Sequence, residues 1–207
     1  MFVKDIHKGV PSDHRQTEKA ALNNDTGSDN PASNAGSPAD TMRQDLPASQ
    51  GVTGVEGRFV EIAGERYYLI EHADKMAPFF VSIVSDADHW LFVSSTGGLT
   101  AGRVSPATAL FPYVTVDKVH ESAVHTGCKT ILQLDIDGKH YEWEPFNMEH
   151  DGLYQITRNI YKNVLGNKLC FEEINQDLQL LYRYTWETSD DYGFVRRCEL
   201  CNLSDAD

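Results

Sequence analysis

Residues 130–144 read TILQLDIDGKHYEWE, and this stretch decides the fold. The pair Asp137-Gly138 stands between two segments of alternating character, a position in which Asp-Gly is among the strongest indications of a tight β-hairpin turn. Apolar residues alternate with polar ones from Leu132 to Ile136, as they do on a strand with one buried face. The stretch therefore predicts two antiparallel strands, one on each side of the turn.

The same pattern continues on both sides of this hairpin. Short runs of aromatic and β-branched residues, separated by turn residues, extend from about Arg58 to Leu203, and no long segment keeps helical periodicity. Two short strands are expected within 58–70, around Ala63-Gly64-Glu65. The other expected strands lie at 79–85, 90–95, 130–136, 140–144, 153–163, 168–174, 178–186 and 193–203. The sequence thus predicts an all-β fold, an antiparallel β-sandwich built as a meander with short connections.

The first quarter of the chain differs in composition. From Gln16 to about Val52 it consists mainly of Ala, Asn, Asp, Ser, Gly, Pro and Thr, with little to bury. We expect a disordered low-complexity arm over residues 1–57 and a folded domain over residues 58–207. The composition leaves open whether the arm is a tether, a docking segment or an unselected extension.

The charge of the chain limits its partners. It has 31 acidic and 18 basic side chains and a net charge of −13, which repels phosphate backbones and anionic headgroups. We therefore expect no nucleic-acid partner and no membrane. The first ten residues, MFVKDIHKGV, lack an apolar export segment, which predicts a cytoplasmic protein whose four cysteines are reduced.

Residues 94–103, SSTGGLTAGR, are rich in glycine and small residues. Gly97, Gly98 and Gly102 predict a loop that allows close backbone approach. The segment lacks the Gly-Lys-Ser/Thr of a phosphate loop and the Gly-x-Gly of a dinucleotide site. Either the loop packs beneath its neighbours, or it binds a ligand with the help of Arg103.

No complete catalytic or metal site is predicted. Cys198 and Cys201 have CxxC spacing, but residues three apart on a strand point to opposite faces and cannot share a metal. The histidines lack metal-ligand spacing, and no cofactor motif is present. A carboxylate pair for acid–base chemistry could be chosen from Asp86, Asp88, Glu142 and Glu144, but acids are too plentiful to single out two.

The aromatic residues allow two interpretations. The tryptophans and two of the tyrosines could form flat platforms for sugar rings, or they could belong to the core of the sandwich. The residues in question are Trp90, Trp143, Trp186, Tyr113 and Tyr141.

Several longer segments are similar to one protein family. They are MAPFFVSIVSDADHW at 76–90, STGGLTAGR at 95–103, ALFPY at 109–113, WEPF at 143–146 and YKNVLGNK at 161–168. Together they resemble the opening of cellobiose-phosphorylase-like proteins, which are glycoside phosphorylases and their relatives. The likeness runs from about Glu65 to the C-terminus.

The resemblance implies a galactose-mutarotase-like β super-sandwich, incomplete in this chain, that precedes a catalytic (α/α)₆ barrel. No segment matches the barrel, so no catalytic residue is carried over. The implied partners are carbohydrate of the β-glucoside type, inorganic phosphate in the complete protein and a second copy of the chain. The candidate ligand-binding residues are Arg103, Trp90, Tyr113 and Trp143. Two alternatives are a stand-alone carbohydrate-binding or dimerisation module and a mutarotase-like epimerase with a His and a Glu.

Overall fold

The structure is a computed structural model that describes residues 54–111 and 113–204. Nearly all regular structure in this part of the chain is antiparallel β-sheet, which confirms the predicted fold class. The strands are β1 (Glu56–Ile62), β2 (Glu65–Glu71), β3 (Phe80–Ile83), β4 (His89–Ser94), β5 (Leu99–Arg103), β6 (Leu132–Ile136), β7 (Lys139–Trp143), β8 (Ile156–Asn163), β9 (Lys168–Asn175), β10 (Leu180–Ser189) and β11 (Gly193–Asn202). The helical elements are α2 (Val116–Val119) and the short 3₁₀ turns η1 (Ala73–Lys75), η2 (Pro106–Thr108), η3 (Ser122–Val124) and η4 (Met148–His150).

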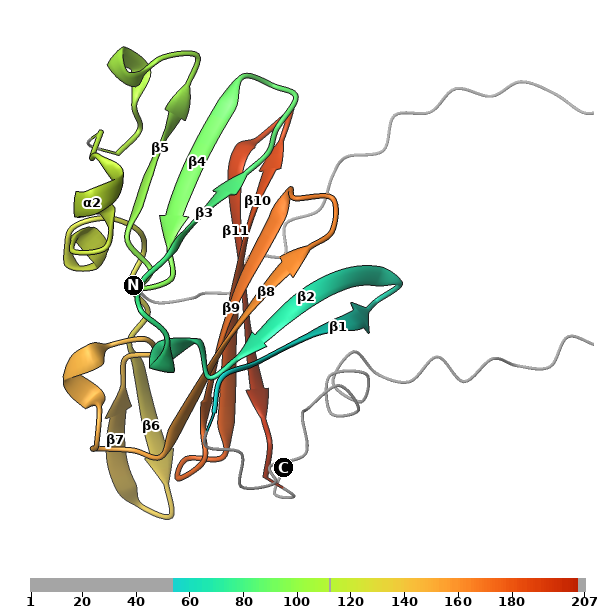
Figure 1. Cartoon of the computed structure of the whole chain (residues 1–207). Helices are drawn as coiled ribbons and strands as arrows, with labels where there is room; N and C mark the ends of the chain where they lie inside the picture. Colours follow the sequence, from blue (N-terminus) through green and yellow to red (C-terminus); the bar gives the residue numbers. More distant parts are fainter. Residues whose placement is uncertain (1–53, 112, 205–207) are drawn as a thin grey trace, which may run out of the picture. The chain divides into compact units, whose positions relative to one another are not determined.

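The strands form two layers. One layer is a six-stranded sheet in the order β1-β2-β8-β9-β10-β11, and the other combines the three-stranded sheet β3-β4-β5 with the hairpin β6-β7 (Figure 1). Apolar side chains from both layers meet in one core cluster. Its most deeply buried members are Leu91, Val93, Leu99, Ala101, Trp143, Leu169 and Phe171. The two layers are thus held by the burial of facing side chains, as in a sandwich.

The predicted hairpins are confirmed. Asp137-Gly138 turns between β6 and β7, and Leu132 pairs with Trp143 as the alternation requires. The segments expected around Ala63 and between residues 79 and 95 form the hairpins β1-β2 and β3-β4.

The simple meander is wrong, because β2 does not pair with β3. Instead Ile70 of β2 pairs with Ile160 of β8, and the residues between these strands build the second layer. Short connections favour pairing of sequential strands, but here β3 to β7 serve the sandwich better by covering the sheet. The strands β8, β9 and β10 are buried on both faces, so their sequences lack a clean polar–apolar alternation.

The glycine-rich segment also differs from its prediction. Residues 99–103, expected as part of a loop, form β5, and the turn is confined to the residues before Leu99. A Cβ atom at Gly98 would overlap the carbonyl oxygen of Val119, and one at Gly102 would overlap the indole of Trp90. Both glycines therefore permit close packing within the protein, which is the structural interpretation of this segment.

The predicted arm lies almost wholly outside the described residues, and β1 begins at Glu56, just before the expected start of the domain. Within the described part of the chain, no helix has both the length and the apolar character that crossing a membrane requires.

Candidate functional site

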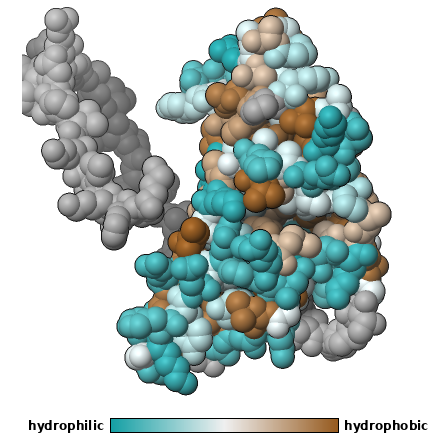
Figure 2. Space-filling model, turned by 90° about the vertical axis from the view of Figure 1, so that its left-hand side faces the viewer, coloured by the Kyte–Doolittle hydropathy of each residue, from teal (hydrophilic) through white to brown (hydrophobic). Residues whose placement is uncertain are grey.

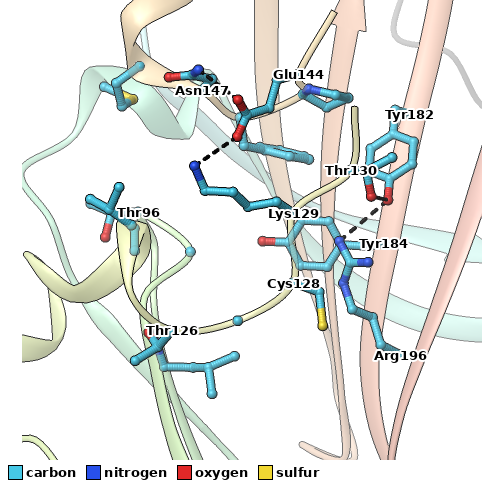
Figure 3. A pocket seen from close by; sticks show the side chains of 18 of the residues that line it. Thr96, Thr126, Cys128, Lys129, Thr130, Glu144, Asn147, Tyr182, Tyr184 and Arg196 are labelled. Atoms are coloured by element: carbon cyan, nitrogen blue, oxygen red, sulfur yellow. Dashed lines mark hydrogen bonds and ion pairs between the residues drawn. The ribbon is translucent and has the colours of Figure 1, made fainter. Parts of the chain in front are cut away.

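A cavity of about 390 Å³ opens beside the inner face of β10 and β11. Four segments surround it: the turn between β4 and β5, the stretch from α2 to η3, residues 126–130 and residues 144–149 (Figure 3). It combines aromatic rings with charged and polar side chains. The lining residues used below are Gly97, His120, Lys129, Thr130, Glu144, Phe146, Asn147, Tyr182, Tyr184, Trp186 and Arg196.

Aromatic rings form one wall of the cavity. Tyr182, Tyr184 and Trp186 alternate along β10 and point to the inner face of the sheet. Tyr184 stacks on Phe171, with 4.8 Å between ring centroids, and meets the edge of Phe146 at 5.1 Å. Because each ring is packed against another, the wall is fixed before any ligand arrives.

A first polar group consists of Lys129, Glu144 and Asn147. The Lys129 ammonium lies 3.1 Å from one carboxylate oxygen of Glu144, and the Asn147 amide donates to the other oxygen at 3.0 Å (Figure 3). The side-chain oxygen Oδ1 of Asn147 in turn accepts from the backbone N–H of Glu149 at 2.9 Å. Amide and carboxylate are therefore held in one orientation, and each keeps hydrogen-bonding capacity for a ligand.

A second polar group consists of Thr130, Tyr182 and Arg196. The Thr130 and Tyr182 hydroxyls are 2.7 Å apart, and Arg196 donates to the Tyr182 oxygen at 3.4 Å. Its guanidinium lies over the ring of Tyr184, 4.4 Å from the centroid (Figure 3). Burial raises the pKa of Tyr182 and of Tyr184, so both phenols stay protonated at neutral pH.

A buried carboxylate holds the segment at residues 144–149 in place. Glu173, fully buried in β9, accepts from the Trp143 indole at 2.9 Å and from the Phe146 backbone N–H at 2.7 Å. Its cationic partner, Arg158, donates to it at 2.7 Å and to the backbone carbonyl of Asn147 at 3.2 Å. The cavity wall on this side therefore depends on one ion pair inside the core.

The opposite side contains a serine and a histidine in contact. The Ser94 hydroxyl lies 2.7 Å from His120 Nδ1 and 2.8 Å from the Thr96 hydroxyl, which donates to the His120 carbonyl at 2.9 Å. A nucleophile and its base would show such a distance. Ser94, however, is completely buried, so this network fastens the end of β4 to α2 and offers no open nucleophile.

The structure separates the residues predicted from the sequence. Gly97 lines the cavity, and a Cβ atom at this position would lie 3.5 Å from the Tyr184 hydroxyl oxygen. Arg103 is exposed at the end of β5 and does not line the cavity. Trp143 belongs to the core, which is the second of the two interpretations: its indole is completely buried and its N–H donates to Glu173, so it offers no platform to a ligand.

Trp90 and Tyr113 come together elsewhere, in a row of aromatic rings on the outer face of the three-stranded sheet. Trp90 lies 6.1 Å from Tyr113 and 6.2 Å from Phe92, which lies 6.3 Å from Phe80. We call Phe80, Phe92, Trp90 and Tyr113 the aromatic row. On the side of the molecule that carries β5, α2 and β7, apolar spots are separated by hydrophilic side chains and form no continuous apolar surface on the described residues (Figure 2).

The metal predictions concern β11 and the scattered histidines. Cys198 pairs with Tyr184 of the inner face and Cys201 with Leu181 of the outer face, so the two thiols point apart as expected. The part of the chain that the structure describes contains no group of three or more His, Cys, Asp or Glu side chains that could hold a metal ion.

Sequence reasoning missed most of the cavity. Glu144 was one of several acids without a distinguishing feature, and Lys129, Thr130, Asn147 and Arg196 drew no attention. One usable indication was the alternation of aromatic residues at 182, 184 and 186, which marks one face of a strand. The segments that meet at the cavity are far apart in the sequence, so only the fold brings them together.

No protein-family model and no curated protein matches the chain. The resemblance to cellobiose-phosphorylase-like proteins therefore stays a prediction.

Proposed function

We propose that this chain binds carbohydrate in the cavity beside β10 and β11, as the sandwich segment of a glycoside-phosphorylase-like protein. The observation that supports the proposal is one cavity that combines fixed ring faces with fixed hydrogen-bonding groups. Sugars present apolar C–H faces that pack on aromatic rings such as Phe146, which lines the cavity and is partly exposed. Their hydroxyls exchange hydrogen bonds with carboxylates, amides and ammonium groups such as those of Glu144, Asn147 and Lys129.

The dimensions of the cavity fit this role. A volume of about 390 Å³ is within the range of about 300–1,000 Å³ that small-molecule sites occupy. The polar groups lie on both sides of the aromatic wall, so a ring packed on Phe146 would have donors and acceptors at its edge. In small-molecule sites the apolar lining usually provides most of the contact area, and a few polar groups fix the orientation of the ligand.

The proposal assigns binding to this segment and leaves phosphorolysis to another. The described residues contain one α-helix of four residues and therefore no helical barrel of the kind implied by the resemblance. The four cysteines are free thiols, which supports the reducing cytoplasm as the compartment of the protein.

The test is a titration of the full chain with cellobiose and cellotriose, in which calorimetry and tryptophan fluorescence measure binding. Trp186 lines the cavity, Trp90 belongs to the aromatic row, and Trp143 is completely buried. We expect saturable binding and a fluorescence change that persists in Trp90→Phe. A change that disappears in Trp90→Phe while calorimetric binding is also lost would move the site to the aromatic row.

Variants of the first polar group locate the site further. Glu144→Gln and Lys129→Met remove the charges that face each other in the cavity, and we expect each to weaken binding about tenfold, the effect of one charge-assisted hydrogen bond. Lys139→Met is the matched control, because Lys139 is an exposed lysine that does not line the cavity. Binding that is unchanged in both cavity variants, or absent from the wild type, would refute the proposal.

A further inference from the structure

Arg196 differs from three other cations of the cavity wall and the sheet. Among the described residues, Lys129 of the cavity wall, Arg158 of β8 and Arg197 on the opposite face of β11 each have a carboxylate within ion-pair distance, whereas Arg196 has none. The pairs are Lys129 with Glu144 at 3.1 Å, Arg158 with Glu173 at 2.7 Å, and Arg197 with Glu187 at 2.8 Å. Arg196 is partly buried and has no carboxylate partner among the described residues, so its guanidinium is free to receive an anion.

The guanidinium of Arg196 is nevertheless held in place. Its plane lies over Tyr184, one nitrogen donates to the Cys198 sulfur at 3.0 Å, and another donates to the Tyr182 oxygen at 3.4 Å. A thiol sulfur is a weak acceptor, and 3.4 Å is a long hydrogen bond. The side chain is therefore oriented by its contacts while much of its donor capacity stays available.

An arginine without a carboxylate partner is unusual in a chain as acidic as this one. The chain has a net charge of −13, so a cation without a carboxylate partner is not a consequence of a general excess of basic residues. Two other carboxylates line the cavity, those of Glu121 and Glu149, and both belong to exposed residues. Water screens exposed charges, whereas Arg196 is half-buried against the aromatic wall.

We infer that the ligand of this cavity is an acidic carbohydrate, a sugar with a carboxylate or phosphate group that Arg196 binds. A guanidinium can donate two parallel hydrogen bonds to a carboxylate or to a phosphate, so the same side chain suits either acidic group. The sugar ring would pack on Phe146, with its charged group towards Arg196 of β11. This inference rests on the proposed carbohydrate function and adds the class of sugar.

The experiment compares neutral and charged sugars on the full chain by calorimetry. The probes are glucose and cellobiose, glucuronate and glucose 6-phosphate, and inorganic phosphate. We expect glucuronate or glucose 6-phosphate to bind on the order of tenfold more tightly than glucose, a preference that shrinks as salt rises. The two charged sugars distinguish a carboxylate from a phosphate as the natural group.

Variants of β11 assign the preference to one residue. In Arg196→Gln we expect the dissociation constant of glucose, divided by that of the charged sugar, to fall towards one. In Arg196→Lys we expect an intermediate ratio, because lysine keeps the charge but not the planar fork. Arg197→Gln is the matched control. Arg197 is the next residue of the same strand, points to the opposite face and pairs with Glu187, so its variant should keep the wild-type ratio.

Each outcome separates this inference from the proposed function. If cellobiose binds in the cavity and the charged sugars show no preference, the inference is wrong and the carbohydrate function stands. If the preference for charged sugars survives in a folded Arg196→Gln, Arg196 does not bind the acidic group. If inorganic phosphate alone binds as tightly as glucose 6-phosphate, the site does not recognise an acidic sugar. If no sugar of either kind binds, the proposed function fails, and the inference fails with it.

Discussion

Glu172 and Glu173 are neighbours in β9, both are fully buried, and each faces an arginine on a different side of the same sheet. On the outer face, Glu172 accepts from Asn159, Tyr161 and Arg183, all of which belong to the adjoining strands β8 and β10. On the inner face, Glu173 and Arg158 reach out of the sheet.

The partners of Glu173 and Arg158 differ in position from those of Glu172. They include the Phe146 backbone and the Asn147 carbonyl, which belong to the segment that lines the cavity. The two ion pairs have similar chemistry, but only the inner one connects the sheet to the site. The comparison shows that the same burial of charge can serve the sheet alone or can also position a binding segment.

The largest effect should come from breaking either pair. Arg158→Met and Arg183→Met each leave a fully buried carboxylate without its arginine, and such a loss costs about 3–5 kcal/mol in stability. We expect similar losses in the free energy of unfolding from the two variants, measured by denaturant titration. A loss below about 1 kcal/mol in either variant would mean that water replaces the missing cation.

Removing one neutral donor should cost less. Trp143→Phe deletes the indole N–H bonded to Glu173, and Tyr161→Phe deletes the hydroxyl bonded to Glu172. Tyr161→Phe keeps its ring, so its expected cost is that of one hydrogen bond to a charged group, about 1.5–3 kcal/mol. Trp143→Phe also leaves a void at a completely buried position, so it should cost more than Tyr161→Phe, about 3 kcal/mol. Tyr154→Phe is a suitable control, because the Tyr154 hydroxyl belongs to an exposed hydrogen bond, and its loss should change stability by less than about 1 kcal/mol.

The two pairs should differ in their effect on ligand binding. At a temperature where both variants are folded, Arg158→Met should weaken cellobiose binding about tenfold, because Asn147 and its neighbours lose an anchor. Arg183→Met should leave binding within about twofold of the wild type, since its contacts stay within the sheet. Calorimetry on the two folded variants measures the difference. If both variants weakened cellobiose binding equally, binding would depend on the stability of the whole sheet and not on the contact between Arg158 and Asn147.

The pH dependence of stability should have opposite signs on the two faces. On the outer face, burial raises the pKa of the Cys170 thiol from 9.0 to about 12. The stability that this thiol contributes is complete below pH 9 and is lost between pH 9 and about 12, by up to about 1.4 kcal/mol per pH unit. Denaturant titrations of wild type and Cys170→Ala across this range should show a shallower decline in the variant.

On the inner face, burial lowers the pKa of Lys162 from 10.5 to about 8. The unfolded chain then binds more protons than the folded one between pH 8 and 10.5, so this group makes stability rise with pH over that window. Its ammonium donates to the Ser82 and Gly166 carbonyls and remains partly exposed, so the effect is smaller than that of Cys170. Lys162→Met should remove the rise, and an unchanged pH profile would contradict it.

Local patterns predicted the hairpins because a hairpin is a local structure. Asp137-Gly138 and the alternation around it are enough to place β6 and β7, and the same holds for β1 with β2. The pairing of β2 with β8 could not be predicted, since no local feature of either strand identifies a partner so distant in the sequence. The glycines before and within β5 indicated a loop, whereas they serve the close approach of Val119 and Trp90.

The candidate site was less predictable than the fold. Trp143 is of a residue type that sugar platforms use, but it is buried because the hairpin β6-β7 packs on the six-stranded sheet, where its indole meets Glu173. Arg196 and Arg197 are identical in type and adjacent in the sequence, and only the strand register shows which of them faces the cavity. Such distinctions arise from tertiary contacts, which a single sequence does not display.

The pairing of Ile70 with Ile160 also bears on how the protein is made. A ribosome adds about 5–20 residues per second, so the hairpin β1-β2 waits several seconds, while roughly 90 further residues are synthesised, before β8 can cover its edge. During that interval an unpaired strand edge is open to other nascent chains. Slow translation of residues 72–155 would lengthen this exposure, and a chaperone that shields strand edges would shorten it.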